Sequence, residues 1–248
     1  MCKTSKNTSD QRTENEIAHG KYLAANDPPK VWNWDSPAGR VRWERRKNML
    51  LGQLNNGNKV LEIGCGTGLL TSEIGNMNVR LTVIDISVDL LEIARKNNAS
   101  TNTTFLLEDA ANMSFDDGSF DIIIGSSVFH HLDVGRATSE FFRVLKPGGK
   151  MVFTEPNMLN PQIALQKNWP YLKKRMGDSP DETAFIRWNL HRQLKRSGFI
   201  QVEITPFDFM HPSLPEWLIN PIDNFLEYLE KVPVVKEIAG SLFIRAIK

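Results

Sequence analysis

The sequence predicts an α/β fold in which helices cover both faces of a doubly wound sheet. Short apolar runs with the character of buried strands alternate along the chain with segments of helical spacing. The first of these runs leads directly into a glycine-rich turn and then a helix, which is how a βαβ unit begins. Acidic residues or serine follow several of the later runs, at the strand ends where ligands bind in such folds.

The predicted elements follow one another in a regular order. Strands are expected at residues 59–63, 79–86, 104–107, 121–125, 150–154, 199–205 and 241–247. Helices are expected at residues 37–54, 69–77, 88–98, 136–144 and 180–196. Pro180 with two acids behind it favours a helix start, and Gly148-Gly149 favours the change from a helix to a strand.

The glycine-rich turn is the segment Glu62-Ile63-Gly64-Cys65-Gly66-Thr67-Gly68. Glycine is needed where the backbone turns sharply and a ligand approaches without a Cβ in the way. A dinucleotide fingerprint would read G-x-G-x-x-G, but Leu69 stands where its third glycine would fall. Glu62 precedes the loop, and a carboxylate there suits a cationic ligand better than a pyrophosphate.

This segment closely resembles the first motif of class I S-adenosylmethionine (SAM) dependent methyltransferases. Residues 113–132 resemble the fourth motif of their small-molecule branch, which includes ubiquinone- and menaquinone-type enzymes, and residues 145–149 match a further signature turn. The resemblance is strong over residues 60–154 and weak over the last hairpin. It implies a seven-stranded Rossmann-like sheet with an antiparallel last strand, and methyl transfer from SAM to a small molecule, with S-adenosylhomocysteine as the product.

The totals fit one soluble domain. The 248 residues carry a formal net charge of +1, so the chain lacks the global basic field of a nucleic-acid binder. Its 2 cysteines cannot define a disulfide scaffold, and Cys65 is expected to be a small buried thiol. Residues 1–16 are too polar for a signal peptide, and no apolar run approaches the roughly 20 residues of a membrane span. A cytoplasmic location is therefore expected.

We expect a disordered tail over residues 1–15 and a single domain over residues 16–248. Residues 16–56 would form an N-terminal helical cap, and residues 158–180 and 207–239 are insertions after strands five and six. The second insertion is rich in large apolar residues. It either packs on the sheet, forms a dimer interface, or encloses an apolar substrate such as a prenyl compound. A monomer or homodimer with weak peripheral membrane contact fits these features.

The cap supplies candidate substrate residues. Trp32 or Trp34 could close over a sulfonium through cation–π attraction, and Arg46 belongs to a group of basic residues that could grip an anionic substrate. The alternative is a solvated basic helix whose apolar stripe packs on the sheet.

The resemblance also implies the cofactor residues. Gly64, Cys65, Gly66 and Gly68 would form the loop, with Glu62 near the amino-acid end of SAM. Asp85, followed by Ile86, would accept from the ribose hydroxyls, although an acid there could instead cap a helix. Asp109 and Ala110 would hold the adenine, and Ser126 the methionine part.

Residues at the ends of strands four and five are the candidates for chemistry. His130, His131 and Glu155 could each take a proton from an attacking atom, and Asn157 could bind the acceptor. A paired histidine could equally satisfy loop carbonyls. No Cys/His/Asp/Glu cluster has the spacing of metal ligands, so no metal is expected.

Other functions are less consistent with these motifs. A NAD-dependent oxidoreductase would need a different glycine spacing and a hydride-site signature such as Tyr-x-x-x-Lys. A nucleic-acid methyltransferase that acts on flipped bases would carry an Asn-Pro-Pro-Tyr-type motif where residues 125–128 read Gly-Ser-Ser-Val. A protein methyltransferase and a non-catalytic SAM-binding regulatory protein both remain open.

Overall fold

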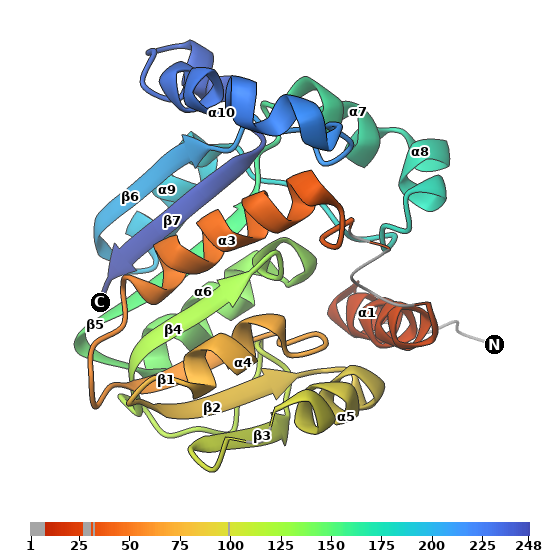
Figure 1. Cartoon of the computed structure of the whole chain (residues 1–248). Coiled ribbons are helices and arrows are strands. Elements are labelled where there is room, and N and C mark those ends of the chain that lie inside the picture. The colour runs from red at the N-terminus through yellow and green to blue at the C-terminus, as the bar shows by residue number, and fades with distance from the viewer. Residues whose placement is uncertain (1–7, 27–30, 32, 99) are drawn as a thin grey trace.

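The structure is a computed structural model that describes residues 8–26, 31, 33–98 and 100–248 (Figure 1). A seven-stranded sheet runs through it in the order β3-β2-β1-β4-β5-β7-β6. Strands β1 to β5 pair in parallel, whereas β7 is antiparallel to both β5 and β6. The strands are β1 (Lys59–Ile63), β2 (Arg80–Asp85), β3 (Thr103–Leu107), β4 (Phe120–Ser126), β5 (Leu145–Pro156), β6 (Ile200–Phe207) and β7 (Ser241–Ile247). This confirms the predicted fold class and the antiparallel last strand.

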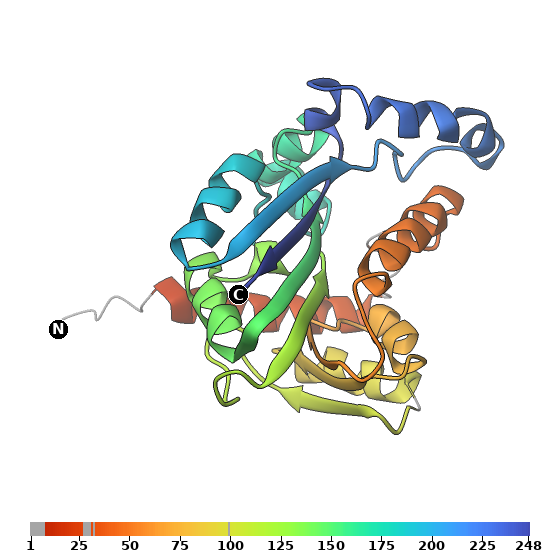
Figure 2. The same ribbon diagram turned by 90° about the vertical axis from the view of Figure 1, so that its left-hand side faces the viewer.

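Helices cover both faces of this sheet, as the side view shows (Figure 2). One face carries α3 (Pro37–Leu51), α4 (Leu69–Gly75) and α5 (Val88–Asn97). The opposite face carries α6 (Val134–Val144) and α9 (Arg187–Arg196). A separate apolar core fills each layer. Leu50, Leu70 and Leu91 belong to the first, and Phe129, Phe141 and Leu190 to the second.

The first helix, α1 (Thr8–Ala25), lies beyond the carboxyl ends of the parallel strands (Figure 1). The expected disordered tail over residues 1–15 is therefore wrong for residues 8–15, while residues 1–7 lie outside the described part. The contacts that hold the helix are long-range, so local composition did not reveal them. Gly20 allows close packing on α5, since a Cβ there would lie 2.5 Å from Ser87 Cβ. The Arg12 guanidinium donates to the carbonyls of His131 and Leu132 at 3.0 and 2.8 Å.

The helix expected over residues 180–196 begins only at Arg187. The segment before it instead pairs with the chain at the carboxyl end of β5, where Asn157 and Phe185 form a parallel bridge. Phe185 N–H donates to Pro156 O at 3.1 Å, and Met158 N–H donates to Phe185 O at 2.9 Å. Because Phe185 is also buried, tertiary pairing overrides the helix-start signal at Pro180.

Both insertions form helices near the same edge of the sheet as α1 (Figure 1). The first contains α7 (Pro161–Asn168) and α8 (Pro170–Arg175), and the second contains α10 (Glu216–Leu229) and the 3-10 helix η2 (Val235–Ile238). No helix among the described residues is long and apolar enough to cross a membrane.

Candidate active site

A cavity of about 560 Å³ opens at the carboxyl edge of the sheet. Its walls come from the strand ends, from α1, from the cap helix α3 and from both insertions. The glycine loop therefore meets several segments of the chain that are far from it in sequence. The cavity has two chemically distinct parts, one around the loop and one around the histidines that follow β4.

The glycine loop carries three residues with positive φ, namely Gly64 (+62°), Gly66 (+54°) and Gly68 (+85°). A Cβ on Gly64 would lie 2.2 Å from Val128 Cγ2, so only glycine fits between the loop and the segment after β4. Gly64 and Gly66 line the cavity. Gly68 does not, and its missing side chain instead leaves room for Asn98 and Ala94 of the neighbouring segment.

Glu62 places a buried carboxyl group in the cavity wall, with 1 % of the residue exposed. Its Oε2 atom has no hydrogen-bond partner among the described residues. Burial raises the pKa of this carboxyl to about 8. A buried acid with a free oxygen needs a cationic or donating partner, and the ammonium group of an amino acid would supply both.

Asp85 lies at the end of β2 and closes the loop from below. Its Oδ2 accepts from Gly66 N at 3.0 Å, and its Oδ1 accepts from Ser87 N at 2.8 Å. Burial raises the pKa of Asp85, although these hydrogen bonds act to lower it. Ser87, rather than Asp85, is the N-cap of α5, so the capping alternative does not describe this acid. Asp85 and Ile86 both line the cavity, with a carboxylate oxygen able to accept further donors.

The remaining predicted cofactor residues also lie on this wall. Asp109 accepts from Ala111 N at 2.8 Å through one oxygen, and Ala110 lies beside it. Ser126 shares a hydrogen bond of 2.9 Å with Thr154. Cys65 is a free, buried thiol, as expected, and burial raises its pKa well above the usual value.

His130 lies between two carboxylates on the other part of the wall. Its Nδ1 is 2.5 Å from Glu155 Oε2, and its Nε2 is 3.3 Å from Glu182 Oε1. Burial disfavours the charged ring, but the two carboxylates outweigh it and raise the pKa of His130 to about 9. Burial also opposes ionisation of Glu182, yet the His130 hydrogen bond and nearby cations hold the pKa of Glu182 well below its usual range.

His131 has a carboxylate partner of its own. Its Nδ1 is 2.9 Å from Glu16 Oε2 on α1. The other oxygen of Glu16 accepts from the Ser179 hydroxyl. Burial alone would raise the pKa of Glu16, but the hydrogen bonds from His131 and Ser179 lower it by more. The pKa is therefore below its usual value, and Glu16 is ionised. The rings of His19 and His131 stack with centroids 5.9 Å apart.

Besides Gly68, two predicted site residues among the described ones are not on the cavity wall. Glu155 is fully buried and accepts from the backbone N–H groups of Val128, Phe129 and His130 at 3.1, 2.8 and 3.3 Å. Asn157 donates to Glu237 O and Ala239 O at 2.8 and 2.7 Å and accepts from Leu159 N. Glu155 therefore positions the histidine loop, and Asn157 ties η2 to β5. Neither side chain faces the cavity, and the predicted direct roles of both stay predictions.

Arg46 and Trp34 of the cap line the cavity, whereas Trp32 lies outside the described residues. The buried Arg46 guanidinium donates to Asp208 Oδ2 at 3.2 Å and to the Ser241 hydroxyl, and lies 5.1 Å from the Trp34 ring centroid. Its Nε has no partner among the described residues. Burial and the neighbouring Arg42 lower the pKa of Arg46 to about 10, which leaves it charged at neutral pH.

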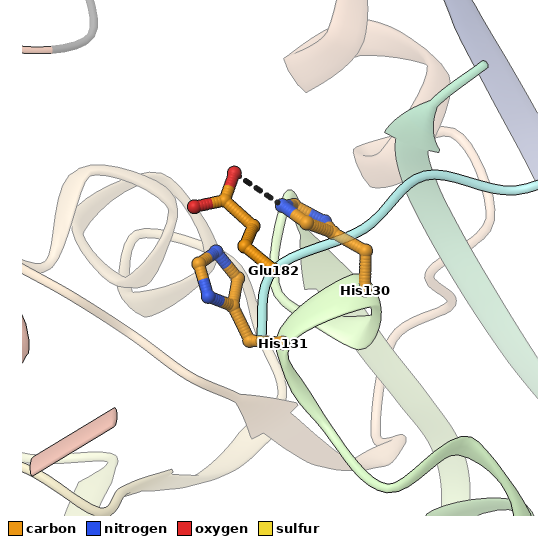
Figure 3. Close-up of side chains that lie close together, drawn as sticks. All are labelled: His130, His131 and Glu182. Carbon is orange, nitrogen blue, oxygen red and sulfur yellow. Dashed lines mark hydrogen bonds and ion pairs between the residues drawn. The ribbon is translucent and has the colours of Figure 1, made fainter. Parts of the chain in front are cut away.

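His130, His131 and Glu182 come together on this wall (Figure 3). Each offers one ligand atom, and these atoms lie within 4.8 Å of one another. The spacing of these residues in the sequence did not reveal this cluster, and the expectation that no metal is bound stays a prediction. Glu182 was missed because it followed Pro180 and looked like the acidic first turn of a helix. Glu16 was missed because it lies far from the histidines in sequence.

Comparison with known proteins places this arrangement in context. A family model described as a methyltransferase domain matches residues 61–153. The chain is 28% identical over 206 residues to 2-methyl-6-phytyl-1,4-hydroquinone methyltransferase of Synechocystis sp., a match covering 75% of this chain and 64% of that enzyme. It is 30% identical over 186 residues to demethylmenaquinone methyltransferase of Lactococcus lactis, covering 65% of this chain and 73% of that enzyme.

A solved structure shares the fold. The N-methyltransferase NodS of Bradyrhizobium japonicum, in complex with S-adenosylhomocysteine, aligns with a TM-score of 0.63 at 20% identity. The alignment covers 94% of this chain and 98% of that one.

Proposed function

The chain belongs to the class I SAM-dependent methyltransferases, whose cofactor is SAM, and from this premise we propose that it methylates a small molecule. The acceptor combines an apolar part with an anionic or hydroxyl group. Less than two thirds of the Synechocystis enzyme is matched, so the family relation supports the type of reaction more than the acceptor.

The part of the cavity around the glycine loop is assigned to the cofactor. Glu62 would receive the ammonium of its amino-acid end, and Asp85 the ribose hydroxyls. Asp109 and Ala110 would border the adenine, and Ser126 the methionine part. The unpartnered Oε2 of Glu62 is the observation that supports this orientation most directly, because a cation is the partner that such a buried oxygen lacks.

SAM supplies a methyl group already activated on a sulfonium. The protein must therefore align the acceptor with that methyl group and exclude water. The helix α1 contributes to this, because Arg12, Glu16 and Leu23 line the cavity from outside the sheet. The cap and both insertions complete the enclosure, which keeps the acceptor away from bulk solvent.

Arg46 supports an acceptor with an anionic group. It is buried, charged and on the cavity wall, and its Nε lacks a partner. Trp34 and Met210 line the same region and offer apolar contact. The Synechocystis relative is named for a phytyl hydroquinone and the Lactococcus relative for demethylmenaquinone, which are quinone-type compounds. An acceptor of this class fits the walls described here.

The acceptor's proton would leave at the polar end of the cavity beside His131, because His130, with a pKa raised to about 9, already holds its proton at neutral pH. Glu155 and Glu16 hold the Nδ1 atoms of these rings and so fix their orientation. Because Glu155 holds the loop from behind, its contribution is to position His130. Of the three catalytic candidates, only the two histidines line the cavity.

The experiment is a methyl-transfer assay with SAM labelled in its methyl group. The panel contains hydroquinones with and without prenyl tails, aromatic carboxylic acids and amines, together with a protein extract. Label should appear in a small-molecule product from a hydroxylated or anionic compound with an apolar part. Label only in protein would favour a protein methyltransferase, and SAM binding without transfer to any compound would favour a regulatory SAM-binding protein.

A pair of arginine variants tests whether the acceptor carries an anionic group. Arg46→Met should raise the KM for the best acceptor at least tenfold and leave the Kd for SAM unchanged. Arg40→Met, which alters an exposed arginine of the same helix, is the matched control and should change neither. An unchanged KM in a folded Arg46→Met protein would remove the anionic group from the proposal.

A further inference from the structure

Each of the two adjacent histidines has one ring nitrogen fixed by a carboxylate. His130 Nδ1 is 2.5 Å from Glu155 Oε2, and His131 Nδ1 is 2.9 Å from Glu16 Oε2. A carboxylate accepts, so each Nδ1 donates, and the nitrogen left to bind a further group on both rings is Nε2. A histidine whose other nitrogen donates to a carboxylate is the usual form of a metal-binding histidine.

The Nε2 atoms of both rings face the same third group. Figure 3 shows the two rings directed toward the Glu182 carboxylate, which comes from the segment before α9. His130 Nε2 is 3.3 Å from Glu182 Oε1, and the three ligand atoms lie within 4.8 Å of one another. Donors that bind a metal at about 2.0–2.2 Å are roughly 3 to 3.5 Å apart, so small side-chain rotations would complete the coordination.

We propose that His130, His131 and Glu182 bind one divalent first-row transition-metal ion. Two imidazoles and one carboxylate are a donor set that suits Zn²⁺, Fe²⁺, Co²⁺ or Mn²⁺. All three residues line the cavity, so the coordination positions that they do not fill face the acceptor part. Three protein ligands with an open position are typical of a metal that meets a substrate rather than one that only holds the fold together.

The ammonium group of Lys167 would compete with a metal ion for the Glu182 carboxylate. This ammonium contacts Glu182 Oε1 and lies 3.0 Å from Asp178 Oδ2. It thereby balances part of the acidic charge in the metal-free chain, and a metal bound at Glu182 must displace it from Oε1. Removal of this ammonium should therefore tighten metal binding, whereas a purely structural ion network has no reason to gain a metal when it loses its lysine.

A metal at this site would also narrow the chemical class of the acceptor, an inference that rests on the proposed function. The metal that these residues would hold would favour the deprotonated form of an acceptor oxygen beside it, with the proton released to water, because His130 and His131 could not take that proton while they bind the metal. The acceptor would then be a hydroxyl or carboxylate compound rather than an amine. Its methyl-accepting atom would lie near that oxygen.

The experiment is a titration of the full-length, metal-stripped chain with Co²⁺ followed by visible absorption, and with Zn²⁺ followed by calorimetry. One ion should bind per chain. His131→Ala and Glu182→Gln should weaken binding by about 100-fold or more, and Glu16→Gln, which removes only a supporting carboxylate, by about 10- to 100-fold. Lys167→Met should bind Co²⁺ more tightly than the wild type. His191→Ala on α9 lies outside the cluster and should change nothing.

The outcomes separate this site from the methyltransferase assignment. Thermal melting and SAM binding of every variant show whether it is folded, and Glu16→Gln provides a test outside the sheet core if Glu182→Gln unfolds. No binding to the wild type, or equal binding to wild type and His131→Ala, would overturn the metal site while SAM binding continued. Metal binding by a chain that transfers no methyl group would instead overturn the proposed function and leave the site intact.

Discussion

Glu62→Gln should affect two properties in opposite senses, namely the affinity for SAM and the stability of the chain without metal or cofactor. The substitution keeps the shape of the side chain but removes the carboxylate that would meet the ammonium of SAM. Hydrogen bonds to charged groups contribute about 1.5–3 kcal/mol. Because each 1.4 kcal/mol is about tenfold in a binding constant, SAM affinity should fall by roughly 10- to 150-fold.

The stability of the free chain should respond in the opposite sense. Burial raises the pKa of Glu62 from 4.5 to about 8, so between these values the folded chain keeps a proton that the unfolded chain has lost. Stability from this group is then lost as pH rises, by about 1.4 kcal/mol per pH unit. Relative to Glu62→Gln, the wild type should lose up to about 3 kcal/mol between pH 5 and 7.5.

Urea unfolding at several pH values and calorimetry with SAM at pH 7.5 measure the two effects. Saturating SAM should remove the pH-dependent loss in the wild type, since a nearby ammonium favours the ionised carboxylate. Glu92→Gln, an exposed acid on α5, is the matched control and should behave like the wild type in both assays. Wild-type SAM affinity in Glu62→Gln would refute the assignment of this residue to the cofactor.

Three further substitutions test the rest of the site. Asp85→Ala should lower SAM affinity more than tenfold in calorimetry while circular dichroism shows an intact fold, and unchanged affinity would remove Asp85 from the ribose role. Gly66→Val should abolish SAM binding, because a β-branched residue is strained at a φ of +54° and would project into the cavity wall; normal binding would contradict the loop assignment. Asn157→Ala should cost about 1–3 kcal/mol of stability in urea unfolding with SAM affinity unchanged, whereas weaker acceptor binding at equal stability would restore it as a substrate residue.

That the residues around the glycine loop lie together could be predicted, because the signals for this part of the cavity are local. Gly64, Gly66 and Gly68 lie within one turn, and their positive φ values explain why glycine occurs at these positions. Asp85 directly ends the second strand, so its place at the sheet edge follows from the strand pattern alone. The alternation of strands and helices likewise determines the parallel half of the sheet.

The acceptor part depends on contacts that sequence spacing does not contain. Glu16 reaches His131 across 115 positions, and Glu182 reaches His130 across 52. Glu155 shows a second difficulty. It stands at the end of a strand, as a catalytic residue would, but its carboxylate turns to three backbone N–H groups of the neighbouring loop. Its position at the end of a strand therefore did not reveal that its carboxylate binds backbone N–H groups.

Calorimetric titration of the purified chain with SAM, S-adenosylhomocysteine and NAD tests the central assignment most directly. The cavity as described should bind one molecule of either adenosyl compound per chain and no NAD, because Glu62 offers a buried carboxylate where NAD would place its pyrophosphate. Binding of NAD in preference to both adenosyl compounds would contradict the assignment of the glycine loop and of the acids around it.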